Sequence, residues 1–477
     1  MKKNNFTFFS GDNVGFIQDG NDAVIRSAYD GYEDMPEKIY ALYEKYKLVN
    51  YGVVSTQFDA VTNHLKHKKL LITYPHEWPP SMFKDAVLFH LDLLLQLQCF
   101  GITLKDALPE NILFSGIRPM FVDFFSILPE DDLSKESWLI NSCPPDVDLR
   151  LYALRLMFVP HMLIPVLCYA IGDFTTGRYL LAERFCNNTS GEIPSWVDLP
   201  QARGIRHLYY LLKDPNYSLL RSQIRAIQDA CMKPDMPWSQ RIAHLRSLVV
   251  GLNVAPPKSG YGTYYEDKKE NWGLGDDSLW QEKQHGVRQI LHDTQPKTVL
   301  DLGSNTGWFS QLACHLGASV VAVDVDISCA DMLYRTAVFS RLQLTPLCLS
   351  FDGLLDEHFA NSDSSHPFHI AALERLQVDC VLCLGLLHHL TLGMGKSFID
   401  IFEQLTALTR NTLVLEFVSM EDKLIQEDSN FFPNLSHWSQ ETYNIEIVKS
   451  TGSRFFNNCS QLPSTPAKSR TLLIFKR

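Results

Sequence analysis

Two adjacent histidines, His388 and His389, are the side chains of this sequence best suited to move a proton. They follow an apolar run, residues 379–384, which predicts a buried strand, so both lie where that strand ends. Imidazole titrates near neutral pH and can take a proton from a hydroxyl or an amine. The alternative is that one or both rings hydrogen-bond to loop backbone. Because neighbouring side chains point in different directions, we expect at most one of them to contact a substrate.

A glycine turn between an apolar segment and a helical one is the second feature with a chemical meaning. The stretch TVLDLGSNTGWF carries Asp301 before the turn and Gly303, Ser304, Asn305 and Gly307 within it. Glycines let the backbone approach a ligand closely, and the N-terminus of the next helix presents unpaired N–H groups to that ligand. The turn lacks the middle glycine of the G-x-G-x-x-G pattern that holds a dinucleotide pyrophosphate. We therefore expect a ligand other than a dinucleotide.

Acidic residues and a further glycine follow the next predicted strands. Asp324 ends the predicted strand 319–323, about 20 residues beyond the glycines, where a carboxylate can accept from both hydroxyls of a ribose. Asp326 is an alternative for that role, and Asp324 could instead cap a helix. Asp352 follows the third predicted strand, and Gly385 follows the fourth. Ligands of open α/β sheets bind outside the carboxyl ends of the strands, so these residues are predicted to share one edge.

The elements that must position these residues are predicted between residue 277 and the C-terminus. Strands alternate with helices, as in a parallel sheet, and two late strand-like segments would close that sheet. The predicted strands begin at residue 298 and continue with 319–323, 346–350, 379–384, 412–417, 444–450 and 470–476, and the helices are 277–292, 308–316, 334–342 and 398–408.

A proline- and glycine-rich linker, residues 253–275, separates this half from the first. We place the boundary at residue 250, which predicts an N-terminal domain over 1–250 and a C-terminal domain over 251–477. The linker carries Tyr261, Tyr264 and Tyr265. These rings could cover a bound cation, since a cation against an aromatic face is favourable, or could pack as an ordinary linker does.

Three segments of the second half, DLGSNTGWFS, LGLLHHL and LEFVSMEDKLIQ, carry a family resemblance. The first resembles motif I of the class I methyltransferases that use S-adenosylmethionine (SAM), which has an amino-acid tail and no pyrophosphate. The second resembles the motif after strand four of many small-molecule methyltransferases. With LKDALPENILFSGIRPMFVDFFS from the first half, the set resembles a two-domain bacterial group that includes nodulation-protein-like methyltransferases.

The resemblance implies a Rossmann-like, seven-stranded α/β domain that binds SAM and methylates a small molecule by direct displacement. Asp301 would contact the ammonium of the SAM tail, Asp324 the ribose and Asp352 the adenine amino group. The implied cofactor-binding residues are Asp301, Gly303, Ser304, Asn305, Gly307, Asp324, Asp352 and Gly385, and the implied catalytic residues are His388 and His389. A protein that senses SAM without turnover is the rival function. No residue pattern selects the acceptor, the methylated atom or the oligomeric state.

The first half carries Asp106, Asn111 and Asp123 around a predicted hairpin, residues 112–124. Asp, Asn five residues later and Asp after a hairpin resemble the catalytic loop and metal-binding strand of protein kinases. That resemblance implies Asp106 as a base and the other two as magnesium ligands, and hence a phosphotransferase joined to a methyltransferase.

The kinase-like pattern departs from the family in several places. Leu104-Lys105 replaces His-Arg, the Asp-Phe-Gly triplet is Asp-Phe-Phe, and only residues 10–15 resemble a glycine-rich loop. We find no paired lysine upstream. The alternative is that Asp106 and Asn111 pin the loop through hydrogen bonds to backbone N–H groups. The sequence therefore predicts an α+β domain, whether kinase-like or not.

Composition narrows the remaining possibilities. The chain has 477 residues with 45% hydrophobic content and a net charge of −11, which argues against a general nucleic-acid-binding surface. Eleven scattered cysteines favour reduced thiols and a cytoplasmic location, and Cys380-x-x-Cys383 has no second pair with which to bind zinc. No signal peptide is predicted, and residues 156–171, the most apolar stretch, are expected to form a buried helix pair rather than a membrane span.

Overall fold

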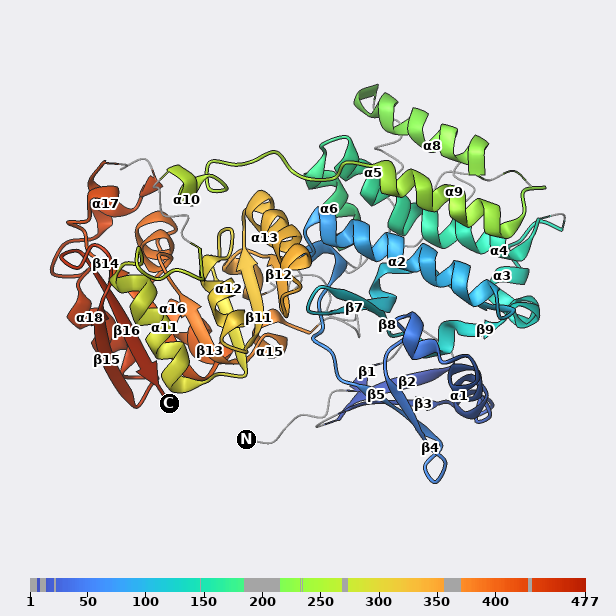
Figure 1. Cartoon of the computed structure of the whole chain (residues 1–477), viewed down its shortest axis with the longest axis horizontal. Coiled ribbons are helices and arrows are strands. Elements are labelled where there is room, and N and C mark those ends of the chain that lie inside the picture. Colours follow the sequence, from blue (N-terminus) through green and yellow to red (C-terminus); the bar gives the residue numbers. More distant parts are fainter. Residues whose placement is uncertain are drawn as a thin grey trace. The chain divides into compact units, whose positions relative to one another are not determined.

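The computed structural model describes residues 7–8, 14–20, 23–145, 147–183, 215–231, 233, 235–267, 273–355, 370–427 and 431–477. The chain divides into two compact units, and in the linker the division falls between Pro256 and Pro257. Each unit has its own sheets and helices (Figure 1).

The C-terminal unit is built on a seven-stranded sheet in the order β12-β11-β10-β13-β14-β16-β15. The first five strands in this order are parallel, whereas β16 runs antiparallel to both β14 and β15. This mixed sheet is consistent with the Rossmann-like methyltransferase domain predicted from the sequence. The strands are β10 (Thr298–Leu302), β11 (Ser319–Asp324), β12 (Leu344–Cys348), β13 (Val378–Cys383), β14 (Thr409–Val418), β15 (Asn458–Pro463) and β16 (Arg470–Lys476).

The register of the central strands brings the predicted site residues to one edge of the sheet. Leu302 of β10 pairs with Val323 of β11 and with Cys383 of β13, so these three strands end together. The strand β13 is buried, including Cys380 and Cys383, as its apolar sequence predicts. The loops that leave these strands therefore meet at the carboxyl edge.

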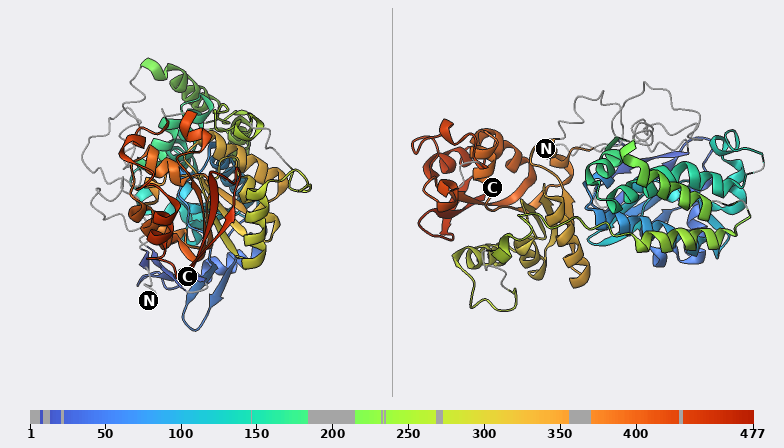
Figure 2. Two further views of the ribbon diagram at one scale, coloured as in Figure 1. Left: turned by 90° about the vertical axis from the view of Figure 1, so that its left-hand side faces the viewer. Right: turned by 90° about the horizontal axis from the view of Figure 1, so that it is seen from above.

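Helices connect the strands and cover the sheet (Figures 1 and 2). Crossovers between parallel strands are right-handed, so the connections from β10 outward to β12 lie on one face and those from β13 to β14 on the other. Predicted helix 398–408 has the same bounds in the structure. The helices are α10 (Tyr264–Asp267), α11 (Glu282–Thr294), α12 (Trp308–His315), α13 (Ile327–Ser340), α15 (Ala372–Arg375), α16 (Phe398–Leu408), α17 (Lys423–Glu427) and α18 (Ile445–Gly452).

The predicted strand 444–450 is wrong, because this segment forms α18. The Asn444 side chain accepts a hydrogen bond from the Ile447 amide at 3.0 Å and so caps the helix, an N-terminal signal that its β-branched residues obscured. The strand that precedes β16 is instead β15, whose residues are largely exposed and lack an apolar pattern. Edge strands of this kind carry little sequence signal.

The N-terminal unit is an α+β structure, as predicted. Its five-stranded antiparallel sheet has the order β1-β2-β3-β5-β4, with α1 inserted between β3 and β4. The strands are β1 (Thr7–Phe8), β2 (Gly15–Asp19), β3 (Ala23–Ala28), β4 (Thr56–Asp59) and β5 (His64–Lys68), and the helix is α1 (Met35–Tyr46).

Helices and two small hairpin-like sheets complete this unit. The predicted hairpin around residues 112–124 is confirmed as the antiparallel pair β7 and β8, and α2 packs against α9 (Figures 1 and 2). The elements are α2 (Pro80–Gln98), β6 (Ile102–Leu104), β7 (Ile112–Ser115), β8 (Arg118–Phe121), β9 (Ile127–Pro129), α3 (Ser137–Ile140), α4 (Leu149–Ala153), α5 (Ile164–Ala170), α6 (Phe174–Glu183), α8 (Ser218–Cys231) and α9 (Trp238–Gly251).

The most apolar segment forms one continuous helix, not the predicted pair. A π-helix, residues 154–163, joins α4 to α5 and contains Pro160, whose missing N–H the wider turn accommodates. Among the described residues, Leu149–Ala170 is the one helix long and apolar enough to cross a membrane, with a mean hydropathy of 1.7. Its apolar window is 89% buried inside the structure, as a core helix of a globular protein would be.

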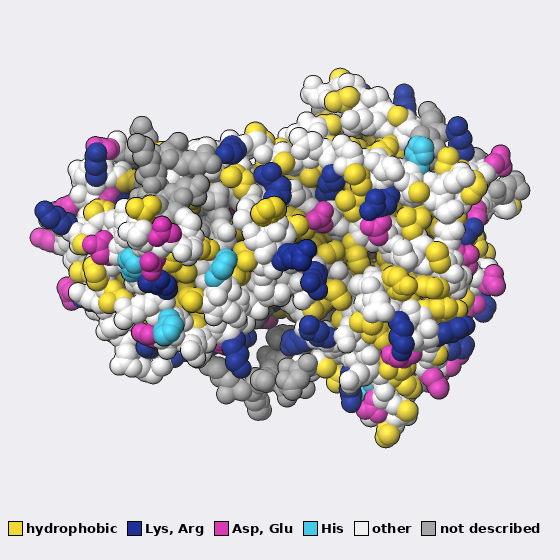
Figure 3. Space-filling model, in the orientation of Figure 1, with side chains coloured by type: hydrophobic (Ala, Val, Ile, Leu, Met, Phe, Trp, Pro, Cys, Tyr) yellow, Lys and Arg dark blue, Asp and Glu magenta, His cyan; other side chains and the backbone are white. Residues whose placement is uncertain are grey.

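Charged side chains on the face shown in Figure 3 are mixed. Lys and Arg side chains lie there among acidic and hydrophobic ones.

Candidate functional site

The glycine turn after β10 adopts the left-handed backbone conformations that its sequence permits. Gly303, Asn305 and Gly307 have φ values of 69°, 52° and 79°, in the left-handed region. A Cβ atom on Gly307 would lie 2.3 Å from a methyl carbon of Leu333, so a side chain has no room there. Gly307 is also the N-cap of α12, and the turn therefore opens directly onto a helix N-terminus.

Asp324 holds this turn in place. One carboxylate oxygen accepts from the Asn305 amide at 2.6 Å, and the other accepts from the Asp326 amide at 2.9 Å. Burial raises the pKa of Asp324, and these backbone hydrogen bonds oppose the rise. Asp326 is the helix cap, because its side chain accepts from the Ser328 and Cys329 amides at the start of α13. The structure thus gives the two carboxylates different structural roles.

Asp301 lies at the end of β10 with only 3% of its surface exposed. The Ser310 hydroxyl of α12 donates to its carboxylate at 2.6 Å. Burial raises the pKa of Asp301 to about 6, because desolvation disfavours the charged form more than the Ser310 hydrogen bond favours it. A cation placed beside this carboxylate would relieve that cost.

The Ser304 hydroxyl in the same turn is buried and has no hydrogen-bond partner among the described residues. Asn305 donates from its side chain to the Tyr261 carbonyl at 2.9 Å, so the tyrosine-bearing linker contacts the turn. A tight turn without a Cβ at Gly307, a buried carboxylate and an unsatisfied hydroxyl fit the amino-acid tail of SAM.

The remaining predicted cofactor residues lie at the ends of β12 and β13. Asp352 follows β12 and forms an ion pair with Lys396, from the segment after β13. Gly385 follows β13 with a φ of 64°, and a Cβ there would lie 3.6 Å from a carboxylate oxygen of Glu416. Both positions belong to the carboxyl edge predicted for them.

His388 and His389 lie next to each other after β13, with ring centroids 4.3 Å apart, and both rings contact Phe432. His388 is buried and His389 is partly exposed. Burial lowers the pKa of both, so both are neutral near pH 7. The nearby positive charge of Arg470 lowers the pKa of His388 further.

Charged residues that were not predicted as site residues gather at the same edge. Lys283 of α11 donates to Glu416 of β14 at 2.7 Å, and Arg470 of β16 donates to Asp422 at 2.8 and 3.0 Å. A charge inside the apolar strand TLVLEFV was the sequence signal for Glu416. The partner cations are more than forty residues away in the chain, so no local spacing reveals them.

A cavity of about 190 Å³ lies in the C-terminal unit beside these cations. Tyr264 and Tyr265 of the linker line it, whereas neither His388 nor His389 does. Of the predicted acceptor contacts, the tyrosines therefore line the cavity and the histidine pair does not. The lining residues are Tyr264, Tyr265, Gln281, Lys283, Gln284, Phe309, Thr465, Pro466 and Arg470.

In the N-terminal unit, Asp106 and Asn111 are joined by a hydrogen bond. The Asn111 amide donates to the Asp106 carboxylate at 2.6 Å, and Ser126 donates to the same oxygen at 2.9 Å. Asp123 pairs instead with Arg26 of β3 at 2.9 Å, so an upstream cation exists, although it is an arginine. These contacts fix the loop, and Arg26 compensates the charge of Asp123. Residues 10–13 of the proposed glycine-loop substitute lie outside the described residues.

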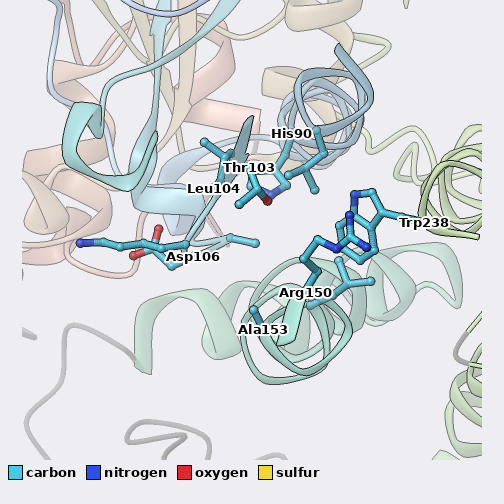
Figure 4. A pocket seen from close by; sticks show the side chains of 11 residues that line it. His90, Thr103, Leu104, Asp106, Arg150, Ala153 and Trp238 are labelled. Carbon is cyan, nitrogen blue, oxygen red and sulfur yellow. The ribbon is translucent and has the colours of Figure 1, made fainter. Parts of the chain in front are cut away.

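A small cavity of about 20 Å³ adjoins Asp106 (Figure 4). Arg150 lies beside Trp238, with its guanidinium carbon 5.2 Å from the ring, and the Asp106 carboxylate points away from both. Such a volume holds about one water molecule and is too small for a nucleotide. Over the part of the chain that the structure describes, no group of three or more His, Cys, Asp or Glu side chains could hold a metal ion.

We expect the Arg26–Asp123 ion pair to contribute to the stability of the fold. Asp123→Ala should lower the free energy of unfolding of the full chain by about 3 kcal/mol, because it leaves a buried guanidinium without its counter-charge. Chemical unfolding measures this, with the exposed Asp131→Ala as control. Unchanged stability, together with loss of magnesium-dependent ATP binding, would make Asp123 a metal ligand instead.

Comparisons with known proteins gave one curated relative and a set of solved structures. No family model matches the chain. The nodulation protein NoeA of Rhizobium meliloti (strain 1021) is 26% identical over 387 residues, which cover 77% of this chain and 73% of NoeA.

Many solved structures match, and two of them illustrate the likeness. An O-methyltransferase family protein from Burkholderia thailandensis matches 40% of this chain and 54% of its own, at 14% identity and a TM-score of 0.30. The bifunctional kinase-methyltransferase WbdD matches 49% of this chain and 45% of its own, at 15% identity and a TM-score of 0.28. The chain therefore spans about half the length of each. With its two compact units and this strand order, the chain is a two-part protein with a methyltransferase-like fold.

Proposed function

We propose that the C-terminal unit transfers a methyl group from SAM to a small-molecule acceptor by direct displacement. One observation carries the proposal: Asp324 fixes the turn from Gly303 to Gly307 through the Asn305 amide, at the carboxyl edge of β10 and β11. That edge is where open α/β sheets bind nucleotide-like ligands. The similarity to NoeA, a nodulation protein by name, agrees with the resemblance to a nodulation-protein-like group and names no acceptor.

Each residue of the edge has a distinct task in this proposal. SAM supplies an electrophilic methyl group on a sulfonium. Asp301 and the N–H groups of the turn hold the amino-acid tail, and the Asp324 oxygens, each with a further lone pair, accept from the ribose hydroxyls. Asp352 and Gly385 border the adenine. The ion pair with Lys396 holds the Asp352 carboxylate in one orientation.

The acceptor's lone pair forms a bond to the methyl carbon while the carbon–sulfur bond breaks, and S-adenosylhomocysteine leaves. Such a step gains chiefly from holding donor and acceptor in line at contact distance. An acceptor that carries a proton must also lose it. Because His389 is neutral and partly exposed, it can take that proton, while the buried His388 packs against it and orients its ring.

The proposal is tested by incubating the full chain with SAM and cell extract. An enzyme releases S-adenosylhomocysteine in proportion to methylated product. A protein that only senses SAM would bind it, as calorimetry would show, without releasing S-adenosylhomocysteine. That outcome would replace methyl transfer by the sensing function.

The histidine pair makes a kinetic prediction. We expect His389→Ala to lower turnover by roughly 10- to 100-fold while SAM affinity stays the same, since a weak base gives the lower end of general-base effects. His388→Ala should also lower turnover more than affinity, through loss of packing. The exposed His437→Ala serves as control. Wild-type turnover in both variants would reduce the pair to scaffolding.

A further inference from the structure

The 190 Å³ cavity of the C-terminal unit presents two cations on one side. Lys283 enters it from the first turn of α11, and Arg470 enters it from the first residue of β16. Phe309 lines this cavity and belongs to the first turn of α12, which directly follows the glycine turn. The cavity therefore adjoins the helix whose N-terminus faces the proposed SAM tail.

Lys283 is held in place by a buried carboxylate. Its ammonium donates to Glu416, which is fully buried, while 17% of the lysine side chain is exposed. The same ammonium lies 5.3 Å from the centre of the Phe309 ring. An ammonium has three donors, and this contact uses one of them, so two remain for a ligand in the cavity.

Arg470 is oriented in the same way. Its Nε and Nη2 atoms donate to Asp422, whose side chain is 2% exposed, and Nη1 donates to no described residue. Burial raises the pKa of Asp422, but hydrogen bonds from Arg470 and Ser469 outweigh it and bring the pKa to about 2. The carboxylate is therefore ionised at neutral pH and holds the guanidinium in a bidentate pair.

The carboxylates and the cations have different access to the cavity. Lys283 and Arg470 line it, whereas Glu416 and Asp422 do not. The acidic groups compensate the charge from within the protein, and the two cations line the cavity. Cations fixed by buried counter-ions are pre-organised donors, which is what recognition of an oxyanion requires.

We propose that this cavity takes an anionic group of the methyl acceptor, a carboxylate or a phosphate, between Lys283 and Arg470. The inference rests on the proposed methyl transfer and names the class of acceptor. Tyr264 and Tyr265 add a partly aromatic wall for the part of the acceptor next to the anion. The charges of Arg470 and Lys283 act on His388, so the cavity lies within electrostatic reach of that ring.

Calorimetry with inorganic phosphate and with succinate tests the inference on the full chain, both alone and saturated with S-adenosylhomocysteine. We expect saturable binding of at least one anion in the saturated protein. The double variant Lys283→Met/Glu416→Gln, which removes both charges of a pair and so avoids a stranded buried carboxylate, should weaken it at least about tenfold. Arg470→Lys keeps the charge but loses the bidentate fork, and should weaken binding about fivefold.

Arg288→Met is the matched control, because Arg288 lies on the same helix and pairs with the exposed Asp277 outside the cavity. Circular dichroism checks that each variant is folded, and Arg470→Lys alone decides the test if the double variant does not fold. Equal anion binding in all variants, or none in wild type, would overturn the inference. Anion binding that S-adenosylhomocysteine abolishes would assign the cations to the SAM tail and also overturn it. Failure to bind S-adenosylhomocysteine at all would count separately, against the proposed function.

Discussion

Asp324→Ala is expected to weaken SAM binding by roughly 10²- to 10⁴-fold, the largest effect of any single substitution considered for this chain. In the proposed complex its carboxylate accepts from two ribose hydroxyls, and hydrogen bonds to a charged group contribute about 1.5–3 kcal/mol each. The substitution also frees the Asn305 amide, which Asp324 holds at 2.6 Å, and so loosens the glycine turn. Calorimetric titration of the full chain with SAM measures the loss.

Asp326→Ala is the matched control for that titration. Asp326 caps α13, so its removal should cost about 1 kcal/mol of stability but change SAM affinity no more than a few-fold. If instead the Asp326 variant lost SAM and the Asp324 variant kept it, the ribose would be held by the alternative carboxylate. Unchanged affinity in both variants would remove this strand end from the site.

Asp301→Asn should make the protein without ligand more stable above pH 6. The folded-state pKa of Asp301 is raised to about 6, whereas an unfolded Asp titrates near 3.9, so between these values only the unfolded chain loses its proton. Stability from this group is therefore full below about pH 4 and falls as the pH rises through 6, with a total cost of about 3 kcal/mol. Asparagine avoids that cost and can still accept from Ser310.

Denaturant unfolding at pH 4 and pH 8 measures this effect, with the exposed Asp293→Asn as control. The higher free energy of unfolding of Asp301→Asn relative to wild type should appear at pH 8 and vanish at pH 4. Because the SAM ammonium favours an ionised Asp301, wild-type affinity should also fall as the pH drops below 6, and the asparagine variant should bind weakly without that dependence. An asparagine variant less stable than wild type at pH 8 would mean that the buried carboxylate is ionised without penalty.

Much of the C-terminal sheet was predictable because its signals are local. Apolar runs that end in Asp301, Asp324 or Gly385 indicate buried parallel strands, and the shared carboxyl edge follows from topology alone. The helix α16 was predicted to the residue because its apolar spacing is regular and Ser397 caps it. By contrast α18 was predicted as a strand, since three β-branched residues outweighed the cap at Asn444.

The charged contacts of both units were not predictable from spacing. Lys283 and Glu416 are 133 residues apart, and Arg26 and Asp123 are 97 residues apart. Only the folded chain brings such partners together, so sequence analysis identified Asp123 without its arginine. The separate roles of Asp324 and Asp326 could be assigned only from the structure, because two acidic residues two positions apart are equally able to cap a helix as far as the sequence shows.

A crystal structure of the full chain with S-adenosylhomocysteine tests the central claim most directly. We expect the ribose hydroxyls to lie on the Asp324 carboxylate and the amino-acid tail to lie over the backbone from Gly303 to Gly307. A ligand bound elsewhere in the unit, or a turn closed by its own side chains in the complex, would contradict it.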